Sequence, residues 1–588
     1  MNYKLSTSTD DSPKKSMRIS LRRIIPFLSE EKGKLILTFC MVILSTISNL
    51  VSPMIIGNTI DTSIQSSDYH GVFMSSLWLL LIYIIGSLAS YIQTKTMGGV
   101  GRRLLFNIRN TIFNKIQELP IAFFDQNKTG DLISRINNDT DKLNQFISQT
   151  LMQFFSNFFL IFGTGIFILF LHFDLSVVTL LPALGVLLIT QLLSPWIKKK
   201  NLQSLQALGG LSATIQENLS SFKVIIAFNR LDYFKKKFDT SNLINYQAGI
   251  GQGISSSLLI PIYGFAGNIA LLLSLWYGIH LITNGSLTIG LLISFQLYLN
   301  NFYSPLRQLA SVWSSLQLSL ASLERVGEIL DLQSNMQVSD EKISISDEEN
   351  SILEFKNVSF HYPDGENIVT NTSFSLEKGK TYAFIGPTGG GKTTTASLIA
   401  RLYDPTEGVV YLDGKDIRSY QPNIRTCKIG FILQEPFLFS GTIRDNIIYG
   451  NSKYSDISDK KLIQLLKKHD LYRFVTKFEG GLNTVIDTSG ESMSLGQKQL
   501  IAFIRAFLRQ PDILILDEAT ANIDTVTEQI LEEILGQLPK TTTKVIIAHR
   551  LNTIKNADEI FFINSGNITP TGSMENAINM LLYGERKS

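Results

Sequence analysis

The stretch "TYAFIGPTGGGKTTTASLIARL", from Thr381 to Leu402, joins a short apolar run, a glycine-rich turn and a longer segment of helix-forming residues. The apolar run Thr381–Ile385 predicts a buried strand, and the segment after the turn predicts a helix. Between them lies the pattern G-x-x-x-x-G-K-T, whose glycines let backbone N–H groups close around phosphate oxygens at a helix N-terminus. The stretch therefore predicts an α/β P-loop NTPase domain that binds ATP.

Two side chains of this loop have expected roles at the phosphates. Lys392 would neutralise the terminal phosphates, and Thr393 would ligate Mg²⁺. Such a motif alone can arise by chance, so its weight depends on partners elsewhere in the chain. The predicted ATP-binding residues of the loop are Gly386, Pro387, Thr388, Gly389, Gly390, Gly391, Lys392, Thr393 and Thr394.

An apolar run that ends in two acids, "ILILDE", supplies the first partners. It predicts a buried strand with Asp517 and Glu518 at its end. Asp517 would hold the hydrated Mg²⁺, and Glu518 would orient or deprotonate the attacking water. Together these two acids predict hydrolysis of ATP.

Two further polar residues follow predicted strands. Gln434 comes after "GFIL", and His549 comes after "KVIIA". A single His at a strand end is usually just a satisfied polar residue, but the order Lys392, Gln434, Glu518, His549 favours one common site in which His549 contacts the γ-phosphate. The predicted catalytic residues are Glu518, His549 and Gln434, and the predicted Mg²⁺ ligands are Thr393, Gln434 and Asp517.

The N-terminal half differs from the C-terminal half in its distribution of apolar and charged residues. Of the 588 residues, 44% are hydrophobic and only 18% are charged, and the long uncharged runs lie before about residue 310. Runs of about 20 apolar residues can cross about 30 Å of hydrocarbon as helices. We expect an all-α transmembrane domain of about six helices, at Leu35–Ile56, Val72–Thr94, Leu151–Phe173, Leu175–Ile197, Ile254–Thr283 and from Ser286 through Tyr303.

The segments between these spans alternate in charge. Lys and Arg are absent from 57–71, from Asp174 and from 284–285, whereas 95–150 and 198–253 carry many of them. Because positive loops stay in the cytoplasm, we expect a multi-pass protein of the cell membrane with both termini and the nucleotide-binding domain inside. Each charged loop is long enough for two helical arms that extend beyond the bilayer and meet something soluble.

The domain boundaries follow from composition. The first 17 residues have no apolar core, so they are not a cleavable signal peptide and are expected to form a disordered tail. "MRISLRRIIPFLSEEKGK" then places basic and apolar residues as an interfacial helix would. The predicted parts are the tail 1–17, the transmembrane domain 18–331, a polar linker 332–351 and the nucleotide-binding domain 352–588.

Several stretches resemble the ABC exporter family. "LPIAFFDQNKTGDLISRINNDTDKL" (119–143) and "ENLSSFKVIIAFNR" (217–230) are similar to its two intracellular loops, and "PLRQLASVWSSLQLSLASLERVGEILD" (305–331) is similar to the end of its last transmembrane helix. With the nucleotide motifs, the resemblance covers 18–588. It implies a half-transporter that exports a substrate at the cost of ATP, with its cytoplasmic loops coupled to the nucleotide-binding domain.

The resemblance also implies roles for single residues. Tyr362 of "VSFHYPDG" would stack on adenine, and Asp524 would belong to the D-loop. In this family two nucleotide-binding domains sandwich two ATP molecules, and each ATP meets an L-S-G-G-Q signature from the other chain. The corresponding residues here are Met493 and the four that would contact ATP in trans, Ser494, Leu495, Gly496 and Gln497.

Leu495 departs from the signature, because it puts a branched side chain where the family has glycine. In a homodimer both sites would carry this defect, whereas in a heterodimer only one would. The stretch around it looks most like the catalytically intact subunit of heterodimeric bacterial ABC exporters. A heterodimer is therefore favoured over a homodimer that tolerates Leu495.

Composition excludes some classes of function. The net charge of +3 is too small for a nucleic-acid binder, and two isolated cysteines, Cys40 and Cys427, imply no disulfide framework or metal cluster. The scarcity of charge inside the spans favours an amphipathic or apolar cargo, and drugs, lipids and peptides all stay open. A homodimeric exporter or lipid flippase also stays open, as does a membrane protein that ATP regulates without pumping.

Overall fold

The chain divides into two compact units. The computed structural model describes residues 3–5, 25–336, 338, 351–363, 365–487, 493–517, 525–547, 556–572 and 574–583. The first unit comprises Met1–Lys4, Glu118–Lys128 and Leu332–Ser588, and the second comprises Leu5–Gln117 and Thr129–Asp331. A short piece of the predicted first loop therefore clusters with the C-terminal domain.

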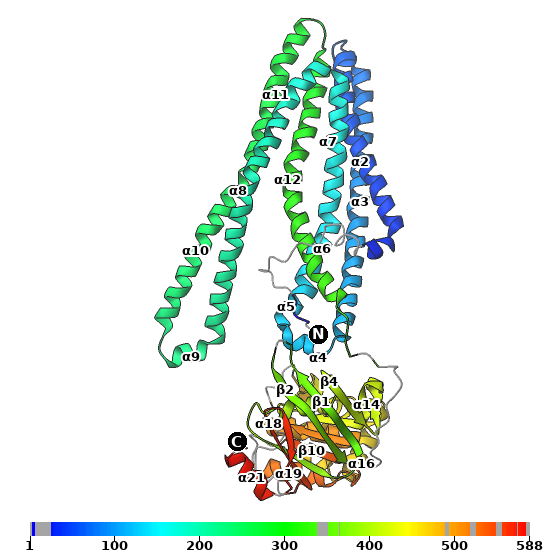
Figure 1. The fold of residues 1–588 in the computed structure, drawn as a ribbon. Coiled ribbons are helices and arrows are strands. Elements are labelled where there is room, and N and C mark those ends of the chain that lie inside the picture. Colours follow the sequence, from blue (N-terminus) through cyan, green and yellow to red (C-terminus); the bar gives the residue numbers. More distant parts are fainter. Residues whose placement is uncertain are drawn as a thin grey trace. The chain divides into compact units, whose positions relative to one another are not determined.

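In its described part the second unit consists of helices (Figure 1). Its described part also has three five-residue π-helical segments, which are rare in proteins and often occur at functional sites. The elements are α2 (Lys32–Thr59), η1 (Ile60–Ile64), α3 (Tyr69–Gln117), α5 (Thr129–Ser134), η2 (Arg135–Asp139), α6 (Thr140–Gln145), η3 (Phe146–Thr150), α7 (Leu151–Leu171), α8 (Phe173–Ser220), α9 (Phe222–Ala227), α10 (Leu231–Ser257), α11 (Leu259–Thr283) and α12 (Ile289–Asp331).

By length and composition, five helical stretches of the described residues can cross a membrane, not the six expected. α12 is 43 residues long but is not among them. Its apolar sequence is interrupted by amides such as Gln296, Asn300 and Asn301, which lower its hydropathy. The five stretches are Lys32–Ile64, Tyr69–Gln117, Thr129–Leu171, Phe173–Ser220 and Leu231–Thr283.

Polar side chains of α12 are nevertheless paired with the backbone of α2. Pro53 has no N–H, so the carbonyl of Asn49 loses its usual helical partner and accepts from Asn301 Nδ2 at 3.3 Å. Tyr298 Oη donates to the Leu50 carbonyl at 2.6 Å, and Ser294 Oγ donates to the Pro53 carbonyl at 2.7 Å. A row of α12 donors thus satisfies the carbonyls around the proline of α2.

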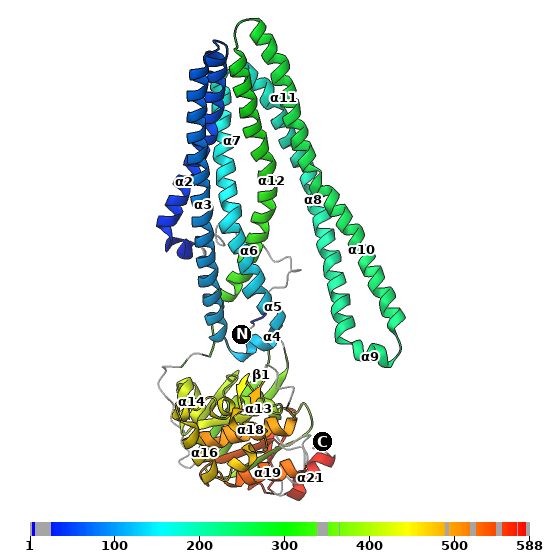
Figure 2. The ribbon, with the colours of Figure 1, turned by 180° about the vertical axis from the view of Figure 1, so that it is seen from behind.

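The two charged loops of the sequence are largely helical, as expected. α3 continues to Gln117, and α8 and α10 form a long hairpin closed by α9 (Figure 2). The tip of this hairpin exposes apolar side chains: Val224 is 57% exposed, Ile226 54% and Phe228 74%. Such a patch on a helical tip is typical of a surface that another protein covers.

The "NNDTD" part of the first loop contributes Asp139 to a partly buried cluster of charges. The Arg135 side chain is fully buried, and it donates to Asp131 at 2.9 Å and to Glu328 at 2.7 Å. Arg325 pairs with Asp131 at 2.6 Å and with Asp139 at 3.2 Å. This cluster of five charges ties α5 and η2 to the C-terminal end of α12.

The first unit combines three sheets with surrounding helices. Its helices are α4 (Ile121–Gln126), α13 (Lys392–Ile399), η4 (Ile417–Ser419), α14 (Pro422–Lys428), α15 (Ile443–Ile448), η5 (Ser452–Tyr454), α16 (Asp459–Lys468), α17 (Tyr472–Val475), η6 (Gly481–Asn483), α18 (Leu495–Arg509), α19 (Thr525–Gly536) and α21 (Met574–Tyr583). Its strands are β1 (Ser351–His361), β2 (Asn367–Glu377), β3 (Thr381–Ile385), β4 (Glu407–Leu412), β5 (Lys415–Asp416), β6 (Ile429–Ile432), β7 (Gly441–Thr442), β8 (Val485–Ile486), β9 (Ile513–Asp517), β10 (Thr543–Ile547), β11 (Glu559–Asn564) and β12 (Asn567–Pro570).

The largest sheet positions the site. Its order is β12-β11-β3-β10-β9-β6, and all neighbours are parallel except β11 and β12. β3 and β9 flank β10, so their carboxyl ends meet at one edge, where ligands of open parallel sheets bind. An antiparallel sheet of order β2-β1-β4-β5 and the two-strand pair β7-β8 complete the unit.

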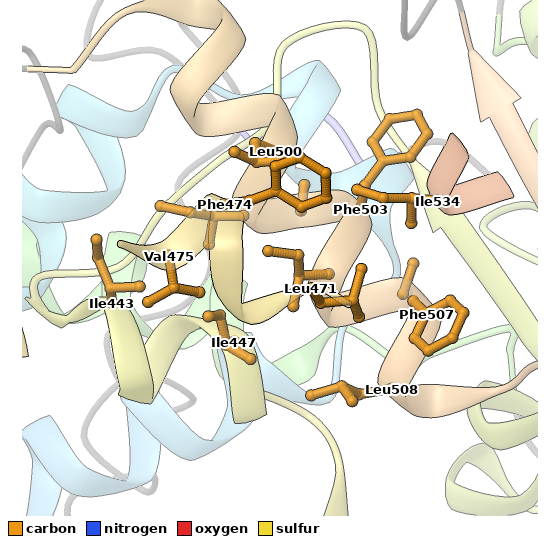
Figure 3. Packing of buried hydrophobic residues seen from close by; sticks show 14 of the residues in the cluster. Ile443, Ile447, Leu471, Phe474, Val475, Leu500, Phe503, Phe507, Leu508 and Ile534 are labelled. Atoms are coloured by element: carbon orange, nitrogen blue, oxygen red, sulfur yellow. The ribbon is translucent and has the colours of Figure 1, made fainter. Parts of the chain in front are cut away.

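The two larger of the three apolar clusters in the described part of this unit bear on the site. One packs side chains of β1 and β4, such as Phe355 and Val410, with those of β3, β9 and β10. The other joins helices α15 to α19 around Leu471, Phe474 and Phe503 (Figure 3). The second core contains the whole buried face of α18, so it fixes the helix that starts at the signature.

Two predicted segments are described only in part. In the tail 1–17, expected to be disordered, the structure describes Tyr3–Leu5, and the side chains of Tyr3 and Leu5 are 2% and 7% exposed. Residues 6–24 lie outside the described part. Of the linker 332–351, residues 332–336, 338 and 351 are described.

Candidate functional site

The glycine-rich loop follows β3 and ends at α13, as the sequence predicts. Gly386 has φ of 146°, and a Cβ there would lie 2.0 Å from the Ile563 carbonyl oxygen. A Cβ on Gly390 would lie 2.7 Å from the same oxygen, and Gly391 has φ of 106°. The loop is therefore pressed against the backbone of β11, and at Gly386 only glycine fits both the space and the backbone conformation.

Lys392 begins α13 inside this loop. Its side chain is 6% exposed, and its Nζ donates to the carbonyls of Gly386 and Pro387, both at 3.0 Å. The ammonium group is thus held within the turn of the loop, at the N-terminus of α13. That placement suits a cation that neutralises a phosphate bound by the loop.

Thr393 and Asp517 bring two oxygen donors together across the sheet edge. Thr393 Oγ1 donates to Asp517 Oδ1 at 3.3 Å, although the two residues lie 124 positions apart in sequence. Asp517 is the buried last residue of β9, and Thr393 is exposed. Hydroxyl and carboxylate oxygens are the donors that Mg²⁺ prefers, so this pair fits the predicted metal ligands.

Tyr362 lies next to the loop within an aromatic cluster. Its hydroxyl lies 3.4 Å from Thr394 Oγ1, and its ring packs edge-on against Tyr403 with 5.3 Å between centroids. Phe360 contacts both tyrosine rings, at 5.0 and 5.5 Å. A half-buried ring beside the phosphate loop suits the predicted stacking on adenine.

Tyr403 is a residue that the sequence analysis did not single out. Its hydroxyl donates to Asp125 Oδ2 of α4, which belongs to the same compact unit. Burial and the neighbouring Asp125 carboxylate raise the pKa of Tyr403 above its usual value, so the phenol stays a donor. Tyr403 directly links the first loop to the predicted adenine pocket. Its place in "LYDP", shortly after α13, is the sequence feature that could have identified it as a candidate.

The signature residues form the first turn of α18. Ser494 Oγ accepts from Gln497 N–H at 3.3 Å, while Gln497 Oε1 accepts from Ser494 N–H at 2.9 Å, which is a capping box. Leu495 is the first residue of the helix and does not have positive φ. The backbone therefore accepts leucine without strain, and the replacement of glycine alters only the surface of this turn.

The remaining predicted residues are described less fully. Gln434 is exposed, on the segment that follows β6. Glu518, Asp524 and His549 lie outside the described residues. The described part stops at Asp517, directly before Glu518. The structure therefore brings together Lys392, Thr393, Asp517 and Tyr362, together with the loop glycines.

Comparison with known proteins agrees with this geometry. Residues 35–306 match the family model for the ABC transporter transmembrane region, and residues 369–521 match the model for the ABC transporter ATP-binding region, described simply as ABC transporter. The first match covers most of the helical unit. The second contains the phosphate loop, the signature turn and Asp517.

Three relatives illustrate the similarity. The ABC transporter ATP-binding protein YfiC of Bacillus subtilis is 35% identical over 576 residues, 96% of this chain and 93% of the relative. A multidrug resistance ABC transporter ATP-binding and permease protein of Lactococcus lactis is 32% identical over 504 residues, 86% of this chain and 85% of its own length. A fatty acid ABC transporter ATP-binding/permease protein of Mycobacterium bovis is 31% identical over 509 residues, 87% and 80% of the two chains.

These matches span both the apolar helices and the nucleotide loop. The architecture, a helical membrane unit followed by an α/β unit with an intact phosphate loop, is that of a half-transporter in which one chain supplies both parts. The chain belongs to the ABC transporter family, as a membrane protein of the exporter type whose ATPase domain is coupled to transport.

Proposed function

We propose that this chain is the catalytically intact half of a heterodimeric ABC exporter, which uses ATP hydrolysis to move an amphipathic or hydrophobic substrate out across the cell membrane. The observation that carries the proposal is the contrast within one nucleotide-binding unit. The phosphate loop and the Thr393–Asp517 pair are complete, whereas the signature turn contains Leu495.

The chemistry at this chain's own loop would depend on fixed charges. Lys392 would bind the terminal phosphates, and Tyr362 would stack on adenine, while Thr393, Asp517 and Gln434 would hold Mg²⁺. When bound, Mg²⁺ neutralises charge on the phosphate oxygens. Glu518 would orient or deprotonate the attacking water, and His549 would contact the γ-phosphate.

Leu495 would act on ATP bound by the partner. A glycine at this position leaves the amides of the first turn open to a phosphate, whereas the leucine side chain occupies part of that surface. The capping box keeps Ser494 and Gln497 in place, so the turn is intact and only its approach is narrowed. The partner's site would therefore hydrolyse ATP slowly, and most ATP hydrolysis would occur at this chain's site.

Two surfaces of the chain are suited to contact with a second subunit. The hairpin tip exposes Val224, Ile226 and Phe228. The nucleotide-binding unit has a cavity of about 230 Å³ whose lining includes Phe431, Leu433, Phe437 and Arg505. In an exporter dimer, the tip of one chain would dock on this surface of the other, and α4 would dock on its own chain. This arrangement fits the proposed coupling of both loops to ATP hydrolysis.

The membrane arrangement follows from charge and pairing. The Lys- and Arg-rich loops support cytoplasmic termini, which require an even number of crossings. α12 would supply the sixth crossing, because its polar groups already bind carbonyls of α2 and need no water. Named cargoes of the relatives, multidrug and fatty acid, support an amphipathic or apolar substrate.

The test is transport by purified protein in lipid vesicles. We expect the isolated chain to hydrolyse ATP poorly, and co-expression with its partner to restore ATP-dependent accumulation of a fluorescent amphipathic dye. Glu518→Gln should lower turnover by about two orders of magnitude with little effect on ATP binding, as loss of a general base implies. Leu495→Gly should raise turnover at the partner's site.

Two outcomes would contradict the proposal. A homodimer of this chain that transports at full rate would show that Leu495 is tolerated and that no partner is needed. Vesicles that hydrolyse ATP at a rate independent of every amphipathic dye, with no accumulation, would contradict export of this class of substrate.

A further inference from the structure

Tyr3 is almost completely buried, although it stands near the start of a segment whose composition predicts disorder. Its side chain is 2% exposed, and burial raises the pKa of its phenol. Ordering a segment of such polar composition costs conformational entropy. The contacts of Tyr3 must therefore offset that cost.

The backbone of Tyr3 binds the end of α4. Its N–H donates to Gln126 Oε1 at 2.8 Å, and its carbonyl accepts from Asn127 Nδ2 at 3.0 Å. Asn127 Nδ2 also donates to the Phe123 carbonyl at 2.7 Å, inside α4. The Tyr3 backbone thus forms one donor and one acceptor hydrogen bond with side chains at the C-terminal end of this short helix.

The side chain of Tyr3 binds a different part of the chain. Its hydroxyl lies 2.7 Å from Asn335 Oδ1 and 3.2 Å from the Gln333 carbonyl, to which it can donate, and it accepts from Asn335 N–H at 3.0 Å. These residues directly follow α12, on the connection that leads into the nucleotide-binding domain. All of these contacts lie within one compact unit.

Tyr3 therefore joins α4, which contacts the nucleotide-binding domain through Asp125 and Tyr403, to residues 332–336, which lead covalently from α12 toward that domain. We propose that Tyr3 is a positioning residue that ties these two connections together, so that α4 and the residues after α12 move as one piece during transport. The proposal rests on the proposed coupling role of α4. It adds the N-terminal segment to that coupling.

The hydrogen bonds allow the two halves of the tie to be tested separately. Tyr3→Phe keeps the ring and the backbone bonds to α4 but removes the acceptor of the Asn335 amide. We expect hydrogen exchange at Asn335 to become about fivefold faster, as the loss of one or two hydrogen bonds implies, with less change in α4. Tyr3→Ala should raise exchange in both segments, and Tyr69→Ala, at a tyrosine that is 88% exposed, should raise it in neither.

The functional arm uses the full transporter in vesicles. We expect Tyr3→Ala to leave basal ATP hydrolysis within about twofold but to lower both its stimulation by transported dye and the amount of dye moved per ATP, because coupling is lost. Tyr3→Phe should fall between wild type and Tyr3→Ala. A tyrosine that served stability alone would instead lower the amount of active protein and leave the ratio of transport to hydrolysis unchanged.

Each arm can overturn the proposal. Unchanged exchange at Asn335 in Tyr3→Phe would show that the tie does not form in the transporter. Faster exchange with an unchanged amount of dye moved per ATP would show that Tyr3 binds Asn335 but does not position α4 and residues 332–336 for transport. A wild-type transporter that shows no stimulation by any dye would contradict the proposed function itself, and with it the role of the tie, whatever the exchange result.

Discussion

Replacing Tyr403 by phenylalanine tests whether its hydroxyl holds α4 in place while its ring supports the predicted adenine pocket. The change removes the hydrogen bond to Asp125 of α4 but keeps the ring that packs against Tyr362 at 5.3 Å. A hydrogen bond to a charged group contributes about 1.5–3 kcal/mol, and solvent exposure of Asp125 lowers this to about 1 kcal/mol. The docking equilibrium of α4 should therefore weaken about fivefold.

Hydrogen exchange of residues 121–126 measures this equilibrium, and binding of a fluorescent ATP analogue measures the pocket. For Tyr403→Phe we expect about fivefold less protection of α4 and an ATP affinity within about twofold of wild type. Tyr403→Ala also removes the ring, so it should reduce both quantities. Asp125→Asn keeps an amide oxygen that can accept from Tyr403 but removes the charge, so its exchange should fall between that of wild type and that of Tyr403→Phe.

The contact should also persist over the whole neutral range of pH. The pKa of Tyr403 is raised in the folded chain, so the stabilising phenol is fully present below about pH 10, the value of an unperturbed tyrosine. Its contribution is lost only as the pH rises through the higher folded value. Unchanged protection of α4 in Tyr403→Phe, or an affinity loss as large as that of Tyr403→Ala, would refute the reasoning.

Two further predictions concern the loop glycines and the buried charges. Gly390→Ala should weaken binding of the ATP analogue at least about tenfold, because its Cβ would lie 2.7 Å from the Ile563 carbonyl oxygen and the loop would have to shift. The control Gly536→Ala, at a position with open space, should bind the analogue normally. Equal affinities of the two variants would contradict the close packing of the loop. Arg135→Met should lower the free energy of unfolding in detergent by about 2 kcal/mol, less than for a fully buried pair because its acidic partners are partly exposed. Lys237→Met, which breaks an exposed pair, should cost less than about 1 kcal/mol, and equal losses would show that the buried cluster contributes little.

The nucleotide loop could be predicted from sequence because its determinants are local. A strand, a turn of glycines and a helix are adjacent in the chain, and the parallel sheet then brings Thr393 to Asp517 across 124 residues. The ends of parallel strands meet at one edge, so an acid at the end of a second buried strand was enough to predict the pair. The roles of Glu518, Asp524 and His549 stay predictions, since these residues lie outside the described part.

The features that sequence analysis missed all depend on distant contacts. Tyr403 meets Asp125 across 278 residues, and Tyr3 meets Asn335 across 332 residues. No spacing rule relates such positions, and the polar composition around Tyr3 predicts disorder without showing the contacts that bury this residue. By hydropathy the described residues contain five spans and not six, because amides lower the hydropathy of α12. Hydropathy cannot show that one of these amides, Asn301, has a partner on α2.

The energy of the Tyr403 contact limits what it can do in transport. α4 has six residues, too few for a stable isolated helix, so its conformation depends on what it docks against. A change in the adenine pocket that broke the Tyr403 bond would shift the docking of α4 by about fivefold at most. A switch from 1:99 to 99:1 needs about 5.5 kcal/mol, several times more. ATP binding cannot drive the transporter through this contact alone, and closure of the proposed dimer around the phosphates would have to supply the rest. In the proposed coupling, the contacts of α4 with Tyr403 and Tyr3 would transmit that motion rather than drive it.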